Sequence, residues 1–147
     1  MFSKSCEYAI RAVLYLAIHS SFVDKLSIKA VAKKLEIPSH FLGKLLQPLV
    51  HNGVISSMKG KNGGFYVSED QQQKTLMDIV VMFDGRKPFN RCTLGLTTCS
   101  DEKPCPIHTE IKPYKSHLEN IITTKTIAEL ASDVKSGIAH LTLTGVK

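Results

Sequence analysis

Three of the four cysteines stand close together, and a histidine follows them in the pattern Cys92-x6-Cys99-x5-Cys105-x2-His108. Thiolate sulfur and imidazole nitrogen are ligands that suit zinc or an iron–sulfur cluster. Structural zinc sites usually pair ligands across two to four intervening residues, and only Cys105 and His108 are paired in that way here. The spacing therefore favours a cluster of two or four irons. Zinc is the alternative, and metal-free thiols that respond to oxidation are a third interpretation.

The segment that holds these ligands, residues 86–108, shows neither helical nor strand periodicity. Structureless loops longer than about 12–15 residues are uncommon and are usually functional or disordered. A bound metal would explain how such a segment becomes ordered. The fourth cysteine, Cys6, lies in an apolar helical pattern and is predicted to be a small buried side chain rather than a ligand.

The N-terminal half is predicted to contain three helices, over residues 5–20, over residues 28–35, and from near Pro38 to Asn52-Gly53. Ser27 is a good N-cap for the second helix, and Pro38 suits the first turn of the third. Asn52-Gly53 closes the third helix, and Pro48 is expected to kink or shorten its last turn.

Two short strands follow, over residues 54–58 and 65–67. The segment between them, Lys59-Gly60-Lys61-Asn62-Gly63-Gly64, is rich in residues that tolerate positive φ, which predicts a hairpin with two lysines at its tip. Helix, tight break, helix and hairpin is the order of a winged helix-turn-helix, whose third helix fits the major groove of DNA. The residues expected to meet bases or phosphates are Ser27, Ser39, His40, Gly43, Lys44, Lys59 and Lys61.

The charge of the chain is distributed unevenly. Residues 1–66 carry nine Lys and Arg against three Asp and Glu, while residues 67–147 carry ten of each, so the first segment holds the whole net charge of +6. Basic charge confined to one module is typical of a polyanion binder, here double-stranded DNA. No nucleophile–base pair or phosphate loop stands out, so an enzyme is not expected. No apolar run approaches the roughly 20 residues of a membrane span, and no signal peptide is evident, which favours a cytoplasmic protein.

The C-terminal half is predicted to hold helices over residues 75–84, 109–123 and 126–134, with Gly85 ending the first of them. The tail from Ser136 shows little pattern. The helix over 109–123 has an apolar stripe formed by Ile111, Tyr114, Leu118, Ile121 and Ile122. A stripe this apolar is not expected to face water, so this helix is predicted to join two subunits into a homodimer. The alternative is that the stripe packs only on its own winged helix.

Five segments together resemble the Rrf-type winged-helix regulators: EYAIRAVLYLA, KGKNGGFYV, TLMDIV, the cysteine loop and TIAEL, in that order over residues 1–136. The resemblance implies a mainly α fold with a small β-hairpin wing and a long dimerisation helix. The corresponding division is a DNA-binding domain over 1–85, a cluster-binding loop over 86–108, and the dimerisation helix with the C-terminal segment over 109–147. It also implies a homodimer on a pseudo-palindromic operator.

The resemblance further implies that Cys92, Cys99 and Cys105 bind an iron–sulfur cluster that controls DNA affinity. In the family's iron–sulfur biogenesis regulators the fourth ligand is a histidine shortly after the third cysteine, which matches His108. In its nitric-oxide sensors the fourth ligand is an acidic residue of the other subunit, which matches Glu7. The alternative function is a zinc-stabilised or metal-free interaction or DNA-binding module that senses no cluster.

Overall fold

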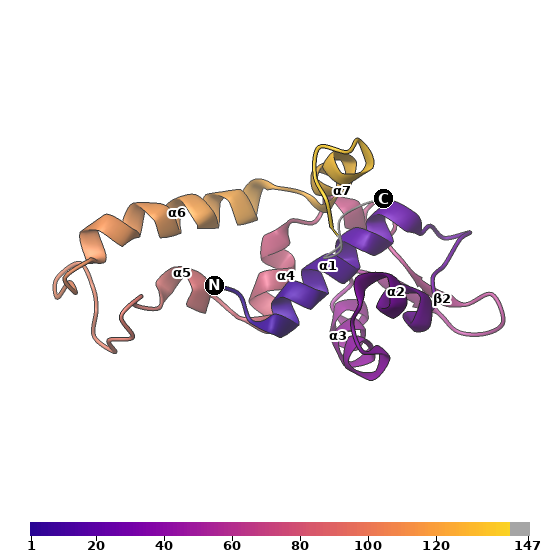
Figure 1. Cartoon of the computed structure of the whole chain (residues 1–147), viewed down its shortest axis with the longest axis horizontal. Helices are drawn as coiled ribbons and strands as arrows, with labels where there is room; N and C mark the ends of the chain where they lie inside the picture. Colours follow the sequence, from indigo (N-terminus) through magenta and orange to yellow (C-terminus); the bar gives the residue numbers. More distant parts are fainter. Residues whose placement is uncertain (142–147) are drawn as a thin grey trace.

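The computed structural model describes residues 1–141 as a helical protein with one two-stranded sheet (Figure 1). The elements in chain order are α1 Lys4–His19, α2 Ile28–Leu35, α3 Ser39–His51, β1 Ser56–Met58, β2 Gly64–Tyr66, the 3-10 turn η1 Gln71–Gln73, α4 Leu76–Phe83, α5 Lys87–Asn90, α6 His108–Thr124 and α7 Ile127–Lys135. The predicted fold class, mainly α with a β-hairpin wing, is confirmed. The predicted tail begins as a turn after α7, and its residues 142–147 lie outside the described part of the chain.

The first three helices form the helix-turn-helix and share one apolar core. α1 packs against both α2 and α3 and is buried on most of its sides, as its composition predicts. The Ser27 hydroxyl accepts from the Ala30 N–H and caps α2, and Glu36 takes a left-handed conformation that ends this helix. Arg11 of α1 donates to the Leu35 carbonyl, which ties α1 to the turn between α2 and α3.

Of the two effects expected of Pro48, a kink or a shortened last turn, the shortening is wrong, because α3 continues to His51. Proline removes only its own N–H, so the bond that is lost is the one to the carbonyl of Lys44. Lys44 is exposed, and water can satisfy its carbonyl. Gly53 then adopts the predicted positive φ, 72°, after the end of the helix.

The wing is the antiparallel hairpin β1–β2, in which Ser57 pairs with Phe65. Leu26 adds a bridge to Phe65, so the segment before α2 lies along the outer side of β2. Gly64 has a φ of 140°, and a Cβ at this position would lie 2.7 Å from the Leu26 carbonyl oxygen. Glycine at position 64 therefore lets the wing lie directly against the helix-turn-helix.

α7 returns to the N-terminal part of the chain and completes its core. It packs against α1, and its Ile127 and Ala131 belong to the same buried cluster as the first three helices. Thr126 and Glu129 form a capping box that fixes the start of α7. We call α1 to α4 with the wing and α7 the winged-helix body.

α6 extends away from this body as an arm and carries the cysteine loop at its far end (Figure 1). It packs against α4 and α5. Residues 86–108 are not wholly irregular, which corrects the sequence prediction: Lys87–Asn90 forms the single-turn helix α5, and His108 is the first residue of α6. One turn is too short to show helical periodicity in the sequence. Within residues 1–141, no helix has the length and apolar character needed to cross a bilayer.

Candidate functional site

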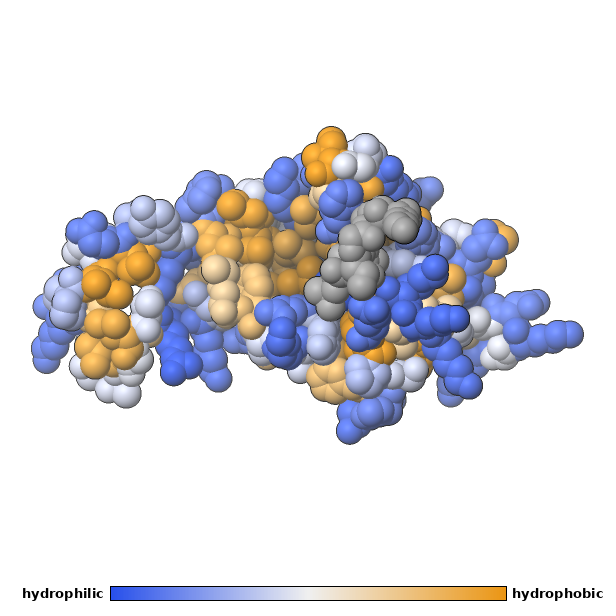
Figure 2. Space-filling view, in the orientation of Figure 1, coloured by the Kyte–Doolittle hydropathy of each residue, from blue (hydrophilic) through white to orange (hydrophobic). Residues whose placement is uncertain are grey.

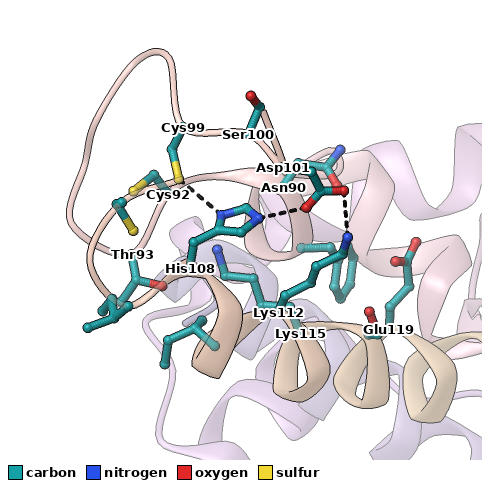
Figure 3. Close-up of a pocket in the computed structure, with 15 residues that line it drawn as sticks. Asn90, Cys92, Thr93, Cys99, Ser100, Asp101, His108, Lys112, Lys115 and Glu119 are labelled. Carbon is teal, nitrogen blue, oxygen red and sulfur yellow. Dashed lines mark hydrogen bonds and ion pairs between the residues drawn. The ribbon is translucent and has the colours of Figure 1, made fainter. Parts of the chain in front are cut away.

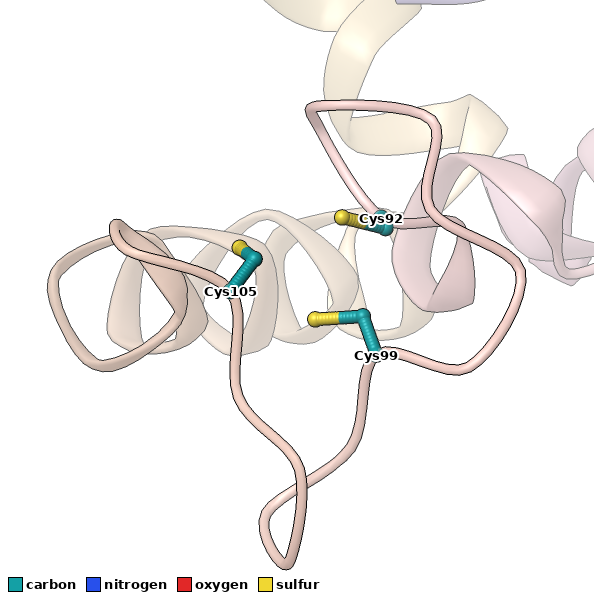
Figure 4. A group of neighbouring side chains, drawn as sticks. All are labelled: Cys92, Cys99 and Cys105. Carbon is teal, nitrogen blue, oxygen red and sulfur yellow. The ribbon is translucent and has the colours of Figure 1, made fainter.

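The three loop cysteines converge on one point (Figure 4). Their Sγ atoms all lie within 4.8 Å of one another, and all three are free thiols. Cys105 is buried, while Cys92 and Cys99 are half-buried. Residues separated by up to thirteen positions are thus brought together by a loop that has no regular structure between Arg91 and Ile107.

The acid–base properties of these thiols depend on one another. Desolvation raises the pKa of the Cys92 thiol, but the backbone N–H groups of Leu94 and Leu96 and the two neighbouring thiols outweigh it and lower that pKa to about 7. For Cys99, the backbone N–H of Cys105 lowers the pKa, but desolvation and the other two thiols raise it overall. Adjacent thiolates repel one another, so a second and third ionisation are opposed unless a cation is present. The donor set therefore fits a metal centre.

The spacing of the sulfur atoms also bears on which metal fits. A single tetrahedral ion with bonds of about 2.3 Å places its sulfur ligands about 3.8 Å apart. Sulfur atoms within 4.8 Å of one another are compatible with that spacing. The same three thiolates, with His108 beside them, would also supply four protein ligands to an iron–sulfur cluster. A cleft of about 390 Å³ adjoins the thiols and is lined also by Asp101, His108 and Lys112.

His108 lies beside the thiols at the start of α6 (Figure 3). Its Nδ1 is 3.1 Å from Cys99 Sγ, and its Nε2 is 2.9 Å from Asp101 Oδ1. Lys112 Nζ, one turn further along α6, is 2.6 Å from Asp101 Oδ2. The hydrogen bond from Lys112, and next that from His108, lower the pKa of the Asp101 carboxyl group.

Glu7, the other candidate fourth ligand, lies on α1. Its carboxylate is 3.0 Å from Lys4 Nζ and is partly exposed. It does not belong to the compact group of sulfur atoms, nor does it line the cleft beside them. Within one chain, His108 is therefore the candidate that lies next to the cysteines.

A second, smaller core joins the cysteine loop to the winged-helix body. Phe89 of α5 is buried together with Cys6 of α1, Val80 of α4 and Ile122 of α6. Cys6 is fully buried, as predicted, and burial is the main reason that its pKa is raised to about 12. Because Phe89 stands three residues before Cys92, the cysteine loop begins next to side chains that pack on α1.

The predicted DNA-contacting residues lie on the body, away from the cysteine loop. Ser39, His40 and Lys44 are exposed on the first part of α3, and Lys59 and Lys61 are exposed on the turn of the wing. Ser27 is exposed but already accepts a hydrogen bond as the N-cap of α2. Gly43 is half-buried, and a Cβ there would lie 3.7 Å from Ile28, so this position faces α2 as well as solvent.

The apolar stripe predicted on α6 is divided between two environments. Ile122 is buried in the second core and Leu118 packs against it, whereas Tyr114 is 75% exposed and Ile121 is 39% exposed. Figure 2 shows hydrophobic side chains gathered along the region where α6 meets α4, and again at the far end of the arm. One edge of the stripe therefore faces the body, and the other edge is open to solvent.

Sequence reasoning missed three residues that shape the site: Asp101, Lys112 and Phe89. Lys112 follows His108 by four positions, which places both on one face of α6, and this spacing could have indicated the pair. Asp101 carries no such signal, because it reaches His108 only through the path of the loop. Phe89 was treated as part of an irregular segment.

The comparisons with known proteins agree with this architecture. A family model described as "Rrf2: Iron-dependent Transcriptional regulator" matches residues 2–133. An HTH-type transcriptional regulator of Aquifex aeolicus (strain VF5) is 31% identical over 132 residues, which cover 88% of this chain and 90% of the relative.

Solved structures share the fold at lower identity. CymR of B. subtilis, the global cysteine regulator, has a TM-score of 0.72 at 21% identity, covering 90% of this chain and 96% of CymR. IscR of T. potens has a TM-score of 0.71 at 18% identity, and the match covers 95% of this chain and 92% of IscR.

The chain belongs to the Rrf2 family of transcriptional regulators. Its members are regulators rather than enzymes, as the sequence predicted. DNA binding follows from this membership.

Proposed function

We propose that this protein is a dimeric transcription regulator whose DNA affinity responds to an iron–sulfur cluster held by Cys92, Cys99, Cys105 and His108. The observation that carries the proposal is the convergence of three free thiols in a loop, with a histidine beside them. The description of the family as iron-dependent supports iron as the metal. When bound, the cluster would supply a group that oxygen, nitric oxide or iron shortage can remove.

The residues around the thiols indicate how loop order would reach the DNA-binding helices. The loop is anchored by Phe89, which packs with Cys6 of α1, and α1 packs against α2 and α3. Ser3, at the start of α1, is hydrogen-bonded through its N–H and its hydroxyl to the Asp84 carboxylate at the end of α4. Holding the loop in one arrangement would therefore bias the position of α1 relative to the helix-turn-helix, which is a population shift of limited size.

The DNA interface in this proposal consists of the exposed first part of α3 and the turn of the wing. Ser39, His40, Gly43 and Lys44 would lie in the major groove, with Lys59 and Lys61 on flanking phosphates and Ser27 near a phosphate at the start of α2. Two such units in a homodimer would read a pseudo-palindromic operator with half-sites about one helical turn apart. In this proposal the two subunits meet through the exposed edge of the α6 stripe, which includes Tyr114 and Ile121.

A second candidate function is a zinc-stabilised regulator that does not sense a cluster. The three converging thiols support it as well, because zinc also takes thiolate and imidazole ligands. In that case the metal would order the loop permanently, and the cysteines would be structural.

Anaerobic purification followed by a visible spectrum and metal analysis tests the proposal. We expect a coloured protein that contains iron and sulfide, and loss of the colour in Cys99→Ala. Cys6→Ala is the matched control, because it removes a thiol that lies in the second core rather than in the loop. A colourless wild-type protein that contains zinc would contradict the cluster and support the second candidate.

The fourth ligand is tested in the same way. We expect His108→Ala to shorten the lifetime of the cluster and Glu7→Gln to leave it unchanged. The reverse pattern would assign the fourth position to the partner subunit's Glu7.

A further inference from the structure

His108 is held between two groups of different chemistry (Figure 3). One ring nitrogen, Nδ1, faces Cys99 Sγ at 3.1 Å, and the other, Nε2, faces Asp101 Oδ1 at 2.9 Å. Lys112 holds the second oxygen of the same carboxylate at 2.6 Å. These contacts form a chain from the Cys99 thiol, through His108 and Asp101, to Lys112 on α6.

The chemistry of these groups fixes where the imidazole proton lies. An ionised carboxylate only accepts hydrogen bonds, so Nε2 must carry the proton and donate it to Asp101. In a neutral imidazole the other nitrogen, Nδ1, then has a free lone pair. That lone pair is on the side of the ring that faces Cys99, which is the side on which a metal ligand would be needed.

We propose that Asp101 is the positioning residue that prepares His108 as a metal ligand, and that Lys112 holds Asp101 in place. This inference rests on the proposed function, because it assumes that His108 binds the metal centre. Ligating histidines commonly donate their second ring N–H to a carboxylate, which fixes both the tautomer and the orientation of the ring. Asp101 reaches across from the loop to make this contact, while His108 and Lys112 both belong to α6.

The energetics favour a positioning role over a stabilising one. Asp101 is 68% exposed and Lys112 is 55% exposed, so their ion pair gives little stability in water. The simpler explanation is that Asp101 adds negative charge near the N-terminus of α6, a favourable place for an acid. Asp101→Asn removes the charge under either explanation, so the two explanations differ for the double change Asp101→Asn with Lys112→Ala, which can restore the hydrogen bond but not the charge.

Asparagine would reverse the hydrogen-bonding pattern. Lys112 only donates, so it would hold the amide oxygen and turn the amide NH2 toward His108 Nε2. Nε2 would then have to accept, and the proton would move to Nδ1, where it blocks the lone pair. We therefore expect Asp101→Asn to be as damaging as Asp101→Ala, and the double change Asp101→Asn with Lys112→Ala, in which the amide can rotate, to recover part of the loss.

The test uses the full chain with the cluster rebuilt anaerobically from ferrous iron and sulfide. Two quantities are measured: the rate at which EDTA removes the visible absorbance, and the histidine nitrogen coupling in the pulsed EPR spectrum of the reduced cluster. We expect Asp101→Ala and Asp101→Asn to lose the cluster about 10–100-fold faster than wild type and to show an altered nitrogen coupling. Glu102→Ala, the adjacent loop acid, is the matched control and should behave as wild type.

The outcomes separate this inference from the proposed function. A wild-type chain that takes up no cluster would contradict both the proposed function and the positioning role of Asp101. A wild-type cluster with equal lifetime and unchanged coupling in both Asp101 variants removes only the positioning role. A cluster that keeps its histidine coupling in His108→Ala also overturns it. Thermal unfolding by circular dichroism shows that each variant is folded, so that a faster loss reports on the ligand.

Discussion

The winged-helix body and the α6 arm are stabilised in different ways. The body has a continuous core to which α1, α2, α3 and α7 all contribute, and its surface carries the basic charge of residues 1–66. The arm has one fully apolar anchor, the second core around Phe89 and Ile122, and the cysteine loop beyond it has no regular structure. A module that keeps its shape is suited to reading DNA, and a module with few apolar contacts is suited to responding to a ligand.

The largest effect is expected at the exposed edge of the α6 stripe, in Tyr114→Lys with Ile121→Lys. Two charges on this surface would prevent its burial against a second subunit, so sedimentation should give monomers and binding to a palindromic duplex should be lost. The matched control is Ser116→Lys with Thr123→Lys, which adds the same charge on the opposite side of the same helix. A folded dimer of the Tyr114→Lys, Ile121→Lys variant would show that α6 does not join the subunits. Ile122 is unsuitable for this test because it is buried within its own chain.

The next effect compares a leucine of each region. Leu46 of α3 is completely buried, and Leu46→Ala should lower the free energy of unfolding by about 2–5 kcal/mol. Leu96 of the cysteine loop is 53% exposed. In protein without metal, Leu96→Ala should change the free energy of unfolding by no more than about 0.5 kcal/mol. Urea unfolding of both variants measures the difference. Equal losses would mean that the loop is part of the cooperative core.

The wing should contribute a smaller, electrostatic effect. Lys59→Ala with Lys61→Ala removes four cationic side chains from a dimer, and each lost phosphate contact should flatten the slope of log affinity against log salt by about 0.9. Lys103→Ala with Lys125→Ala removes the same charge from the other region and should leave the slope unchanged. Fluorescence anisotropy at several salt concentrations measures both, and an unchanged slope in the wing variant would exclude the wing from the interface.

The smallest effect is expected at Ser27. Its hydroxyl caps α2 through the Ala30 N–H, and Ser27→Ala should lower the free energy of unfolding by about 1 kcal/mol. Ser27→Asp keeps an acceptor for the cap but places a negative charge beside the DNA. If Ser27 lies near a phosphate, the aspartate variant should keep its stability and bind DNA more weakly than wild type. Full DNA affinity in the aspartate variant would leave Ser27 with the capping role alone.

The body was more predictable from the sequence than the arm. α2 was predicted with its observed bounds because Ser27, the apolar spacing and the break at Glu36 are local signals. The first strand is predicted longer than observed, because residues 54 and 55 are apolar but pack into the core before the hairpin begins. The second strand has the predicted length but begins one residue earlier. Periodicity reports which side of an element is apolar, and in the body that side is buried within the same chain.

The candidate metal ligands are predictable from the sequence, but the residues that hold them in position are not. Cys92, Cys99, Cys105 and His108 are recognisable by type and spacing, and the three cysteines do converge. The contact of Asp101 with His108 depends on how the loop folds back over α6, and no local pattern encodes that path. The stripe on α6 was also treated as one surface, although the second core covers one of its edges. Long-range packing, rather than propensity, decides these features.

The most direct test of the account is the DNA affinity of the same protein with and without its cluster. A palindromic duplex would first be selected from a random-sequence library with each form, and both forms would then be titrated on each duplex in the same salt. A coupling of about 1–3 kcal/mol predicts affinities that differ about 5–150-fold on at least one duplex. Equal affinities of the two forms on every selected duplex would contradict the claim that the cysteine loop controls the winged helix.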